Sequence, residues 1–406
     1  MGEVSRRLPR WQDVRPLLRM QPRTGTALER RLARALTIDD LRTLGRQRTP
    51  RPVFNYVDGA ADDEISLRRS REVFEQLTFH PRVLRDVSEI DISTTFLGRE
   101  AAMPIAFGPT GFTRMMQHEG ERAVVRAAAR AGIPYTLSTM GTTSIADVVA
   151  AANGGDTWFQ LYVWRDRARS KDLIEQAREA GARALMLTVD VAVPGARLRD
   201  NRGGLTIPPT LTLRTLSQMA RFPRWWLNVL TTEPLTFANF SQAPTELHDL
   251  IASMFDPAVT IEDVEWLRGT WDGPLVVKGI QRVDDARTIV AAGADAIVLS
   301  NHGGRQMDRA VTPLELVPAT VDAVGDRTEV YVDTGVRSGA DVAAAIALGA
   351  RGCFVGRAYM YGLMAGGEKG VDRAAAILRE QLRRTMGHLG ARNLSDLTPD
   401  LVSLRN

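Results

Sequence analysis

The sequence predicts an α/β fold: a (β/α)8 TIM barrel with an N-terminal helical extension and a long insertion after the fourth strand. Two observations carry this prediction. Eight short, continuously apolar and β-prone runs follow residue 102, as expected of parallel strands that are buried on both faces. Helical patterns separate most of these runs. A doubly wound sheet is the alternative, but it offers no reason for eight strands.

A weak internal repeat supports the barrel. Four predicted helices end in Ala-Gly or Leu-Gly, followed by a short link and a strand, at Gly132, Gly181, Gly293 and Gly349. Glycine suits the left-handed residue that ends a helix. The strands are expected within residues 103–109, 135–138, 158–163, 184–190, 274–279, 296–301, 329–335 and 352–357.

The spacing of the runs predicts the domain organisation. Residues 1–102 precede the barrel and are expected to form an N-terminal arm and a helical cap, in which Thr37 and Asp40 form a plausible capping pair. Residues 103–406 are expected to form the barrel. The gap after the run at 184–190 is longer than a βα unit needs by roughly 60 residues. We therefore predict an insertion at about 197–260.

The composition limits the classes of function. The formal net charge is +4, from 52 Lys and Arg against 48 Asp and Glu, which does not favour a nucleic-acid partner. Cys353 is the single cysteine, so no intrachain disulfide can form and a reducing, cytoplasmic location is expected. No apolar run is long enough to span a bilayer, and no signal peptide is apparent. The Arg-rich N-terminus is either a solvated arm or a contact with an anionic membrane surface.

Polar side chains end all eight predicted strands. Each one alone is typically a turn former or a helix cap. Because catalytic groups of such barrels gather where the strands end, the whole set predicts a ring of donors around one mouth. Lys278 stands out, since a buried ammonium is costly without a partner.

The stretch "SNHGGR" (300–305) predicts a catalytic corner. Gly303 and Gly304 allow a sharp turn, so that His302 and Arg305 can both face the mouth. Imidazole can accept a proton, guanidinium matches a carboxylate, and Asp190 could stabilise a charged His302. The pair suits removal of a proton or hydride equivalent beside an acid group. The alternative is a surface turn with solvated side chains.

The last two strands predict a phosphate site. "DTGVRSG" and "VGRA" place glycine amides beside Arg337 and Arg357, in the loops where barrels often hold phosphate. Ordinary turn glycines are the alternative.

These motifs together resemble the FMN-dependent 2-hydroxy acid dehydrogenase and oxidase family, from about Thr37 to Pro399. "SNHGGRQMD", "VDTGVRSG" and "FVGRA" carry the resemblance. "YVDGAADDE", "GARLRDNRGG" and "HPRVLRDV" are similar to the bacterial quinone-linked L-lactate dehydrogenase branch.

The resemblance implies roles for individual residues. His302 would be the base and Asp190 its partner, Arg305, Tyr56 and Arg197 would bind the substrate carboxylate, and Tyr162 would lie near the substrate hydroxyl. The implied FMN-binding residues are Pro109, Thr110, Gly111, Ser138, Gln160, Thr188, Lys278, Ser300, Asp333, Gly335, Arg337, Gly356 and Arg357. No metal site is implied.

Four positions depart from the family pattern, and one of them is Ala60, which stands where relatives of the lactate dehydrogenase branch often have glycine. Thr334 stands where glycine is usual, so a negative φ is expected there. Met140 stands where glycolate oxidase has tryptophan, and Gly111 where many oxidases have alanine. In this family such a glycine often accompanies poor use of oxygen or larger substrates.

The resemblance therefore implies FMN-dependent oxidation of an L-2-hydroxy acid, with L-lactate, oxidised to pyruvate, as the favoured substrate and a quinone or another non-oxygen acceptor. Mandelate or longer 2-hydroxy acids are alternatives. So are a barrel lyase that uses Lys278 as a Schiff base and a flavin-storing barrel without activity. "ARFPRWWLNVL" (220–230) suits either a bilayer interface on the inner face of the cell membrane or packing on protein. Relatives are usually tetramers.

Overall fold

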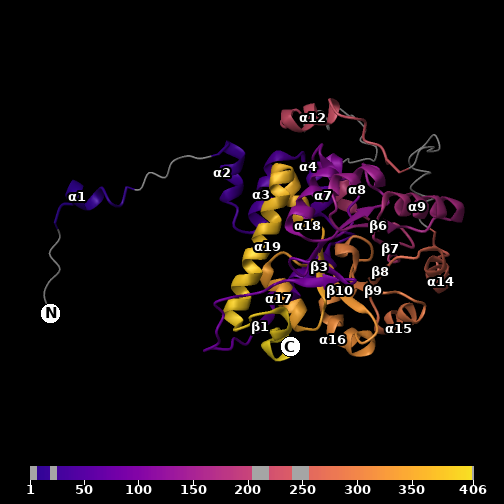
Figure 1. The fold of residues 1–406 in the computed structure, drawn as a ribbon. Coiled ribbons are helices and arrows are strands. Elements are labelled where there is room, and N and C mark those ends of the chain that lie inside the picture. Colours follow the sequence, from indigo (N-terminus) through magenta and orange to yellow (C-terminus); the bar gives the residue numbers. More distant parts are fainter. Residues whose placement is uncertain (1–6, 19–24, 204–218, 240–255, 405–406) are drawn as a thin grey trace.

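A computed structural model describes residues 7–18, 25–203, 219–239 and 256–404. Its centre is a closed barrel of eight parallel strands in the order β10-β11-β4-β5-β6-β7-β8-β9 (Figure 1). Every strand of the barrel falls within a predicted run or overlaps one, which confirms the predicted fold. The bounds are β4 Ile105–Phe107, β5 Tyr135–Ser138, β6 Thr157–Leu161, β7 Ala184–Thr188, β8 Leu275–Ile280, β9 Ala296–Leu299, β10 Glu329–Val332 and β11 Gly352–Val355.

Helices follow the strands and surround the barrel (Figure 1). The glycines at the four repeated helix ends all have positive φ, between 67° at Gly132 and 107° at Gly349, as the repeat predicts. The helices after β4 are α6 Thr113–Met116, α7 Gly120–Ala131, α8 Ile145–Ala152, α9 Arg167–Ala180, α10 Leu198–Gly203, α12 Pro223–Leu230, α14 Ile261–Thr270, α15 Val283–Ala291, α16 Pro313–Val324, α17 Gly339–Ala347, α18 Arg357–Gly366 and α19 Glu368–Leu389.

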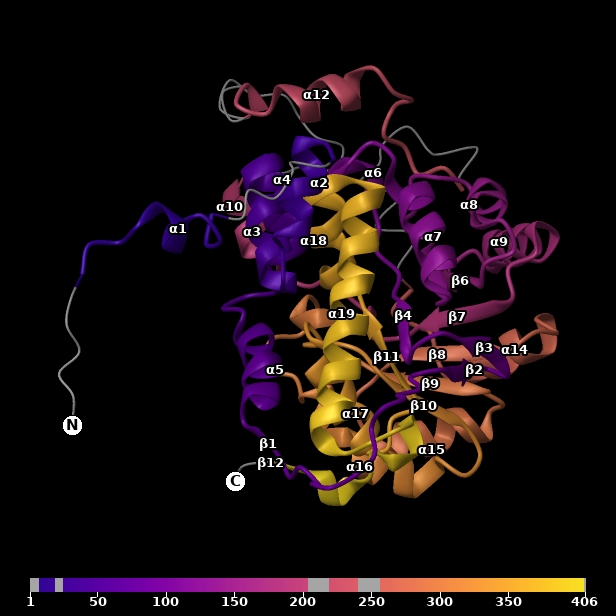
Figure 2. The same cartoon turned by 60° about the vertical axis from the view of Figure 1, so that its left-hand side comes forward.

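Helices α2 to α5 of the N-terminal part lie along one side of the barrel (Figure 2). Thr37 and Asp40 form the predicted capping box of α3. The strands β1 and β12 pair antiparallel, as do β2 and β3. The bounds are α1 Trp11–Val14, α2 Ala27–Ala33, α3 Ile38–Arg48, α4 Arg51–Asp58, α5 Ile65–Glu75, β1 Leu77–Phe79, β2 Thr94–Phe96, β3 Arg99–Ala101 and β12 Val402–Leu404.

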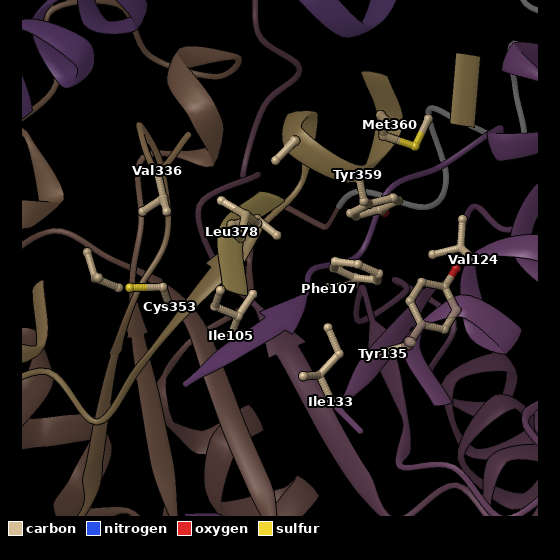
Figure 3. Close-up of a cluster of buried hydrophobic side chains, with 14 of the residues drawn as sticks. Ile105, Phe107, Val124, Ile133, Tyr135, Val336, Cys353, Tyr359, Met360 and Leu378 are labelled. Atoms are coloured by element: carbon tan, nitrogen blue, oxygen red, sulfur yellow. The ribbon is translucent and has the colours of Figure 1, made fainter. Parts of the chain in front are cut away.

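Outward-facing strand residues form the main core with the surrounding helices. Ile105 and Phe107 of β4 lie beside Tyr359 of α18 and Leu378 of α19 (Figure 3). The rings of Phe107 and Tyr359 have centroids 4.8 Å apart. Cys353 is buried within β11 in this cluster, so its thiol is not exposed to substrate or oxidant.

The predicted insertion contributes α10 and α12, while its residues 204–218 and 240–255 lie outside the described part. Trp225 of α12 is buried, and its indole N–H donates to the Met115 carbonyl oxygen at 2.9 Å. Trp225 therefore packs on protein, which was one of the two alternatives for residues 220–230. Leu227 and Leu230 on the same helix are 47% and 71% exposed, so α12 also presents an apolar surface to solvent. None of the described helices combines the length and apolarity that a bilayer crossing needs.

Candidate active site at the mouth of the barrel

A cavity of about 440 Å³ opens where the eight strands end. The predicted site residues line it, except for Gln160, Asp190 and Ser300, which lie in the wall directly behind the lining residues. Side chains from α4, α5 and α10 close the cavity on the outer side. The predicted residues that line it are Tyr56, Pro109, Thr110, Gly111, Ser138, Tyr162, Thr188, Arg197, Lys278, His302, Arg305, Asp333, Gly335, Arg337, Gly356 and Arg357.

His302 is held at the cavity by an unusual backbone. Its φ is 58°, and Gly303 and Gly304 follow at 66° and 73°. The sequence predicted the turn from the two glycines but not the left-handed conformation of the histidine itself. His302 Nδ1 lies 2.9 Å from Asp190 Oδ1, so any proton exchange with a bound molecule falls to Nε2. Burial lowers the pKa of His302 in spite of Asp190, which favours the neutral imidazole that a base needs.

Arg305 is fixed by the C-terminal end of α4. Its Nη1 donates to the carbonyl oxygens of Tyr56, at 2.5 Å, and Gly59, at 3.1 Å. The guanidinium also lies over the Tyr56 ring, 4.9 Å from its centroid. Burial and the nearby Arg197 lower the pKa of Arg305 to about 9, which leaves it charged at neutral pH. These contacts orient a cation beside a second cation, an arrangement that suits a carboxylate ligand.

Lys278 forms a buried ion pair. Its Nζ lies 2.8 Å from Asp333 Oδ2 and donates to Ser300 Oγ at 2.9 Å. Burial opposes the charge of Lys278, but Asp333 and Asp190 outweigh burial and raise its pKa. An ammonium held in this way is not a nucleophile, so the structure disfavours the Schiff-base alternative.

The predicted phosphate end holds three arginines. Arg337 and Arg357 line the cavity as expected, together with Gly335 and Gly356. Arg357 directs its fork at protein carbonyls: Nε donates to Val57 at 2.9 Å, Nη1 to Gly303 at 2.9 Å and Nη2 to Gly59 at 2.7 Å. It therefore ties this end of the cavity to α4 and to the His302 turn.

Arg71 of α5 is the arginine at this end that the sequence did not reveal. It bonds to the Gly335 carbonyl oxygen and pairs with Asp341 at 2.7 Å. No local motif marks Arg71, because it is 264 residues from Gly335 in the chain. Only the packing of α5 against the mouth brings it to the site.

The expectation that Thr334 has a negative φ is wrong. Its φ is 84°, next to Gly335 at 87°. Two hydrogen bonds hold this costly conformation: the Thr334 amide donates to Asp333 Oδ1 at 2.7 Å, and its hydroxyl accepts from the Gly303 amide at 3.1 Å. Thr334 thus joins the loop after β10 to the His302 turn, which a glycine could not do through a side chain.

The cavity fits a flat polar ring with an anionic tail. Among the described residues, Gln160 Nε2 and Thr188 Oγ1 are buried without a hydrogen-bond partner, and both belong to strands that end at the cavity. Buried polar groups are normally satisfied, and a ligand in the cavity would satisfy these two atoms. Lys278 lies on the neighbouring strand β8, whereas Arg337 and Arg357 follow β10 and β11. These residues therefore fit FMN, the cofactor that the sequence resemblance implies.

Comparison with known proteins places the chain in a family. The family model described as FMN-dependent dehydrogenase matches residues 45–404. The chain therefore belongs to the FMN-dependent dehydrogenase family, and it is an FMN-dependent oxidoreductase that acts on 2-hydroxy acids.

Three relatives show the degree of similarity. A putative L-lactate dehydrogenase of Mycobacterium tuberculosis is 51% identical over 400 residues, 98% of this chain and 97% of that protein. An L-lactate dehydrogenase of Caulobacter vibrioides is 41% identical over 373 residues, 90% of this chain and 97% of that protein. Among solved structures, the monotopic membrane protein (S)-mandelate dehydrogenase superposes with a TM-score of 0.87 at 37% identity, covering 91% of this chain and 100% of that one.

Proposed function

We propose that the enzyme oxidises L-lactate to pyruvate and passes the electrons to a quinone. The observation that carries the proposal is that His302, paired with Asp190 in the wall behind it, lines the same cavity as Arg305, Arg197 and Tyr56. A base and a carboxylate clamp in one cavity suit the oxidation of a carbon next to a carboxylate. The two relatives named as L-lactate dehydrogenases support lactate as the substrate.

Substrate binding is proposed to orient the reacting carbon. Arg305 and Arg197 would receive the carboxylate, and the α4 carbonyls that hold Arg305 keep the clamp in place before binding. Tyr162 also lines the cavity, and burial raises the pKa of its phenol, so it remains a hydrogen-bond donor to the substrate hydroxyl.

His302 Nε2 is proposed to take the proton from the substrate hydroxyl or carbon, and Asp190 to stabilise the resulting imidazolium. FMN supplies the two-electron acceptor when bound. Gln160, Ser138, Thr188 and Lys278 would hold its ring, and Gly335, Arg337, Gly356 and Arg357 its phosphate arm. Lys278 would place a positive charge where the reduced ring gains negative charge.

The pH dependence follows from the histidine. Since His302 must be neutral to accept a proton and burial lowers its pKa, kcat/KM should stay high below the ordinary histidine range and fall only as pH drops through the lowered pKa. Asp190 raises this pKa, so Asp190→Asn should move the acid limb to still lower pH.

Anaerobic reduction of the bound flavin tests the substrate. The purified yellow protein is mixed with L-lactate, D-lactate, glycolate or (S)-mandelate, and the flavin band is recorded. We expect L-lactate to bleach it fastest. His302→Ala should keep the colour and slow bleaching by about 10³- to 10⁴-fold, as loss of a general base does. His388→Ala changes an exposed histidine of α19 and should bleach like the wild type. Faster bleaching by (S)-mandelate than by L-lactate would identify mandelate, and not lactate, as the substrate.

A quinone acceptor fits a peripheral membrane position, which we propose on the exposed side of α12. The solved relative described as monotopic supports it, as do the exposed Leu227 and Leu230 beside the exposed Arg224. Sedimentation with anionic vesicles checks this. Leu227→Ser with Leu230→Ser should release the protein, and equal binding of both forms would contradict a role for α12.

A further inference from the structure

Asp200 of α10 is a buried carboxylate in the cavity wall that the proposed mechanism does not use. It is 8% exposed, and Oδ1 has no hydrogen-bond partner among the described residues. It lines the same cavity as Tyr56, Arg197 and Arg305. Burial raises the pKa of Asp200, while Arg305 and Arg197 oppose this shift and favour the charged carboxylate. Because a buried carboxylate with an unpartnered oxygen is costly, its presence here calls for a reason other than packing.

The neighbouring arginine on α10 does not serve as its partner. α10 lies beside α4 (Figure 2), and Arg199 is held there by Asp58 Oδ2, at 3.0 Å, and by Glu64. Arg199 is thus turned to α4 and paired with two carboxylates. Arg197 and Arg305 line the cavity at this end, and Arg357 shares the Gly59 carbonyl oxygen with Arg305.

The carboxylate clamp is rich in positive charge. Asp200 lines the cavity together with Arg197 and Arg305 and brings a carboxylate to them. Asp190 lies 2.9 Å from His302 and is the counter-charge for the proton that His302 accepts. Asp200 therefore places a negative charge beside the cations that would receive the substrate carboxylate.

We infer that Asp200 restricts the pocket to 2-hydroxy acids with a single carboxylate and an uncharged side chain. It does so by repelling a second carboxylate, as in a dicarboxylic 2-hydroxy acid. The inference rests on the proposed function and refines its substrate class. In a buried site, two like charges a few ångströms apart repel strongly, and rejection of this kind is a common source of specificity.

Asp200→Asn tests the inference by removing the charge at constant shape. Binding of two unreactive acids, propionate with one carboxylate and succinate with two, is measured from the change in the flavin spectrum and from thermal stabilisation. We expect the preference for propionate over succinate to shrink by about tenfold or more, the effect of ~1.4 kcal/mol of repulsion. The ratio of kcat/KM for L-malate to that for L-lactate should rise by a similar factor.

Two variants separate charge from structure. Asp63→Asn removes an exposed carboxylate outside the cavity, and Asp200→Glu keeps the charge, so both should retain the wild-type ratios. An unchanged ratio in Asp200→Asn, or an equal loss for both classes of acid, overturns the inference and leaves Asp200 a structural residue. If Asp200→Asn does not fold, Asp200→Ser is measured under the same criteria.

The two proposals fail separately. If L-lactate does not bleach the wild-type flavin, lactate oxidation is wrong. The ratio of succinate to propionate binding still decides the role of Asp200, because it requires no turnover.

Discussion

The barrel interior has two layers built on the same strands, and they differ in what completes them. The lower layer is apolar and contains Trp158, Val276, Tyr331 and Phe354, covered by Phe96 of β2. The upper layer lies two residues further along each strand and contains Gln160, Lys278, Asp333 and Gly356. Since side chains two apart on a strand face the same side, both layers point inward.

The lower layer is filled by aromatic and aliphatic side chains, and Thr136 Oγ1 is the polar atom of this layer without a partner among the described residues. Its rings pack in stacked and edge-on pairs, with centroids 5.1 Å apart for Phe96 and Tyr331 and 5.5 Å for Tyr331 and Phe354. The upper layer pairs Lys278 with Asp333 and Ser138 with Gln160, yet leaves Gln160 Nε2 and Thr188 Oγ1 without a partner among the described residues. The lower layer therefore stabilises the fold, and the upper layer is completed by a ligand.

Lys278→Met should give the largest effect, because it affects both stability and the cofactor. The Asp333 carboxylate would remain buried without its cation, at a cost of about 3–5 kcal/mol in the free energy of unfolding. Chemical denaturation and the FMN content after purification measure the two effects. The double variant Lys278→Met with Asp333→Asn should recover much of the stability but not the flavin. Recovery of both would show that Lys278 only balances Asp333.

Trp158→Ala and Gln160→Ala compare the two layers on one strand. Trp158→Ala empties part of the lower layer and should lower the free energy of unfolding by about 3–5 kcal/mol. The variant protein that stays folded should still bind FMN. Gln160→Ala should cost less stability and weaken FMN binding. Denaturation curves and flavin titration provide the measurements. Equal loss of flavin affinity in the two variants would mean that the layers are not separable.

The upper layer could be predicted from sequence because it depends on local pattern. A strand end fixes where its last inward residue points, so Ser138, Thr188, Lys278 and Asp333 were identifiable one strand at a time. Arg71 and Asp200 were not identified, because they reach the cavity from α5 and α10 through tertiary packing. The backbone of Thr334 was predicted wrongly, since its positive φ depends on a hydrogen bond from Gly303, a residue of another loop.

Gly111→Ala should have the smallest effect and sharpens the view of the upper layer. A Cβ on Gly111 would lie 2.8 Å from the Met140 Cβ, and the Met140 carbonyl oxygen accepts from the Phe112 amide at 3.0 Å. Met140 must therefore move, at a cost of about 1–3 kcal/mol. Because Gly111 and Met140 both line the cavity, we expect kcat/KM to fall more for (S)-mandelate than for L-lactate. The double variant Gly111→Ala with Met140→Gly keeps a single Cβ at this contact, now on residue 111, and should restore part of the stability. A double-mutant cycle measures the coupling between the two positions. Additive losses would show that this contact does not shape the substrate space.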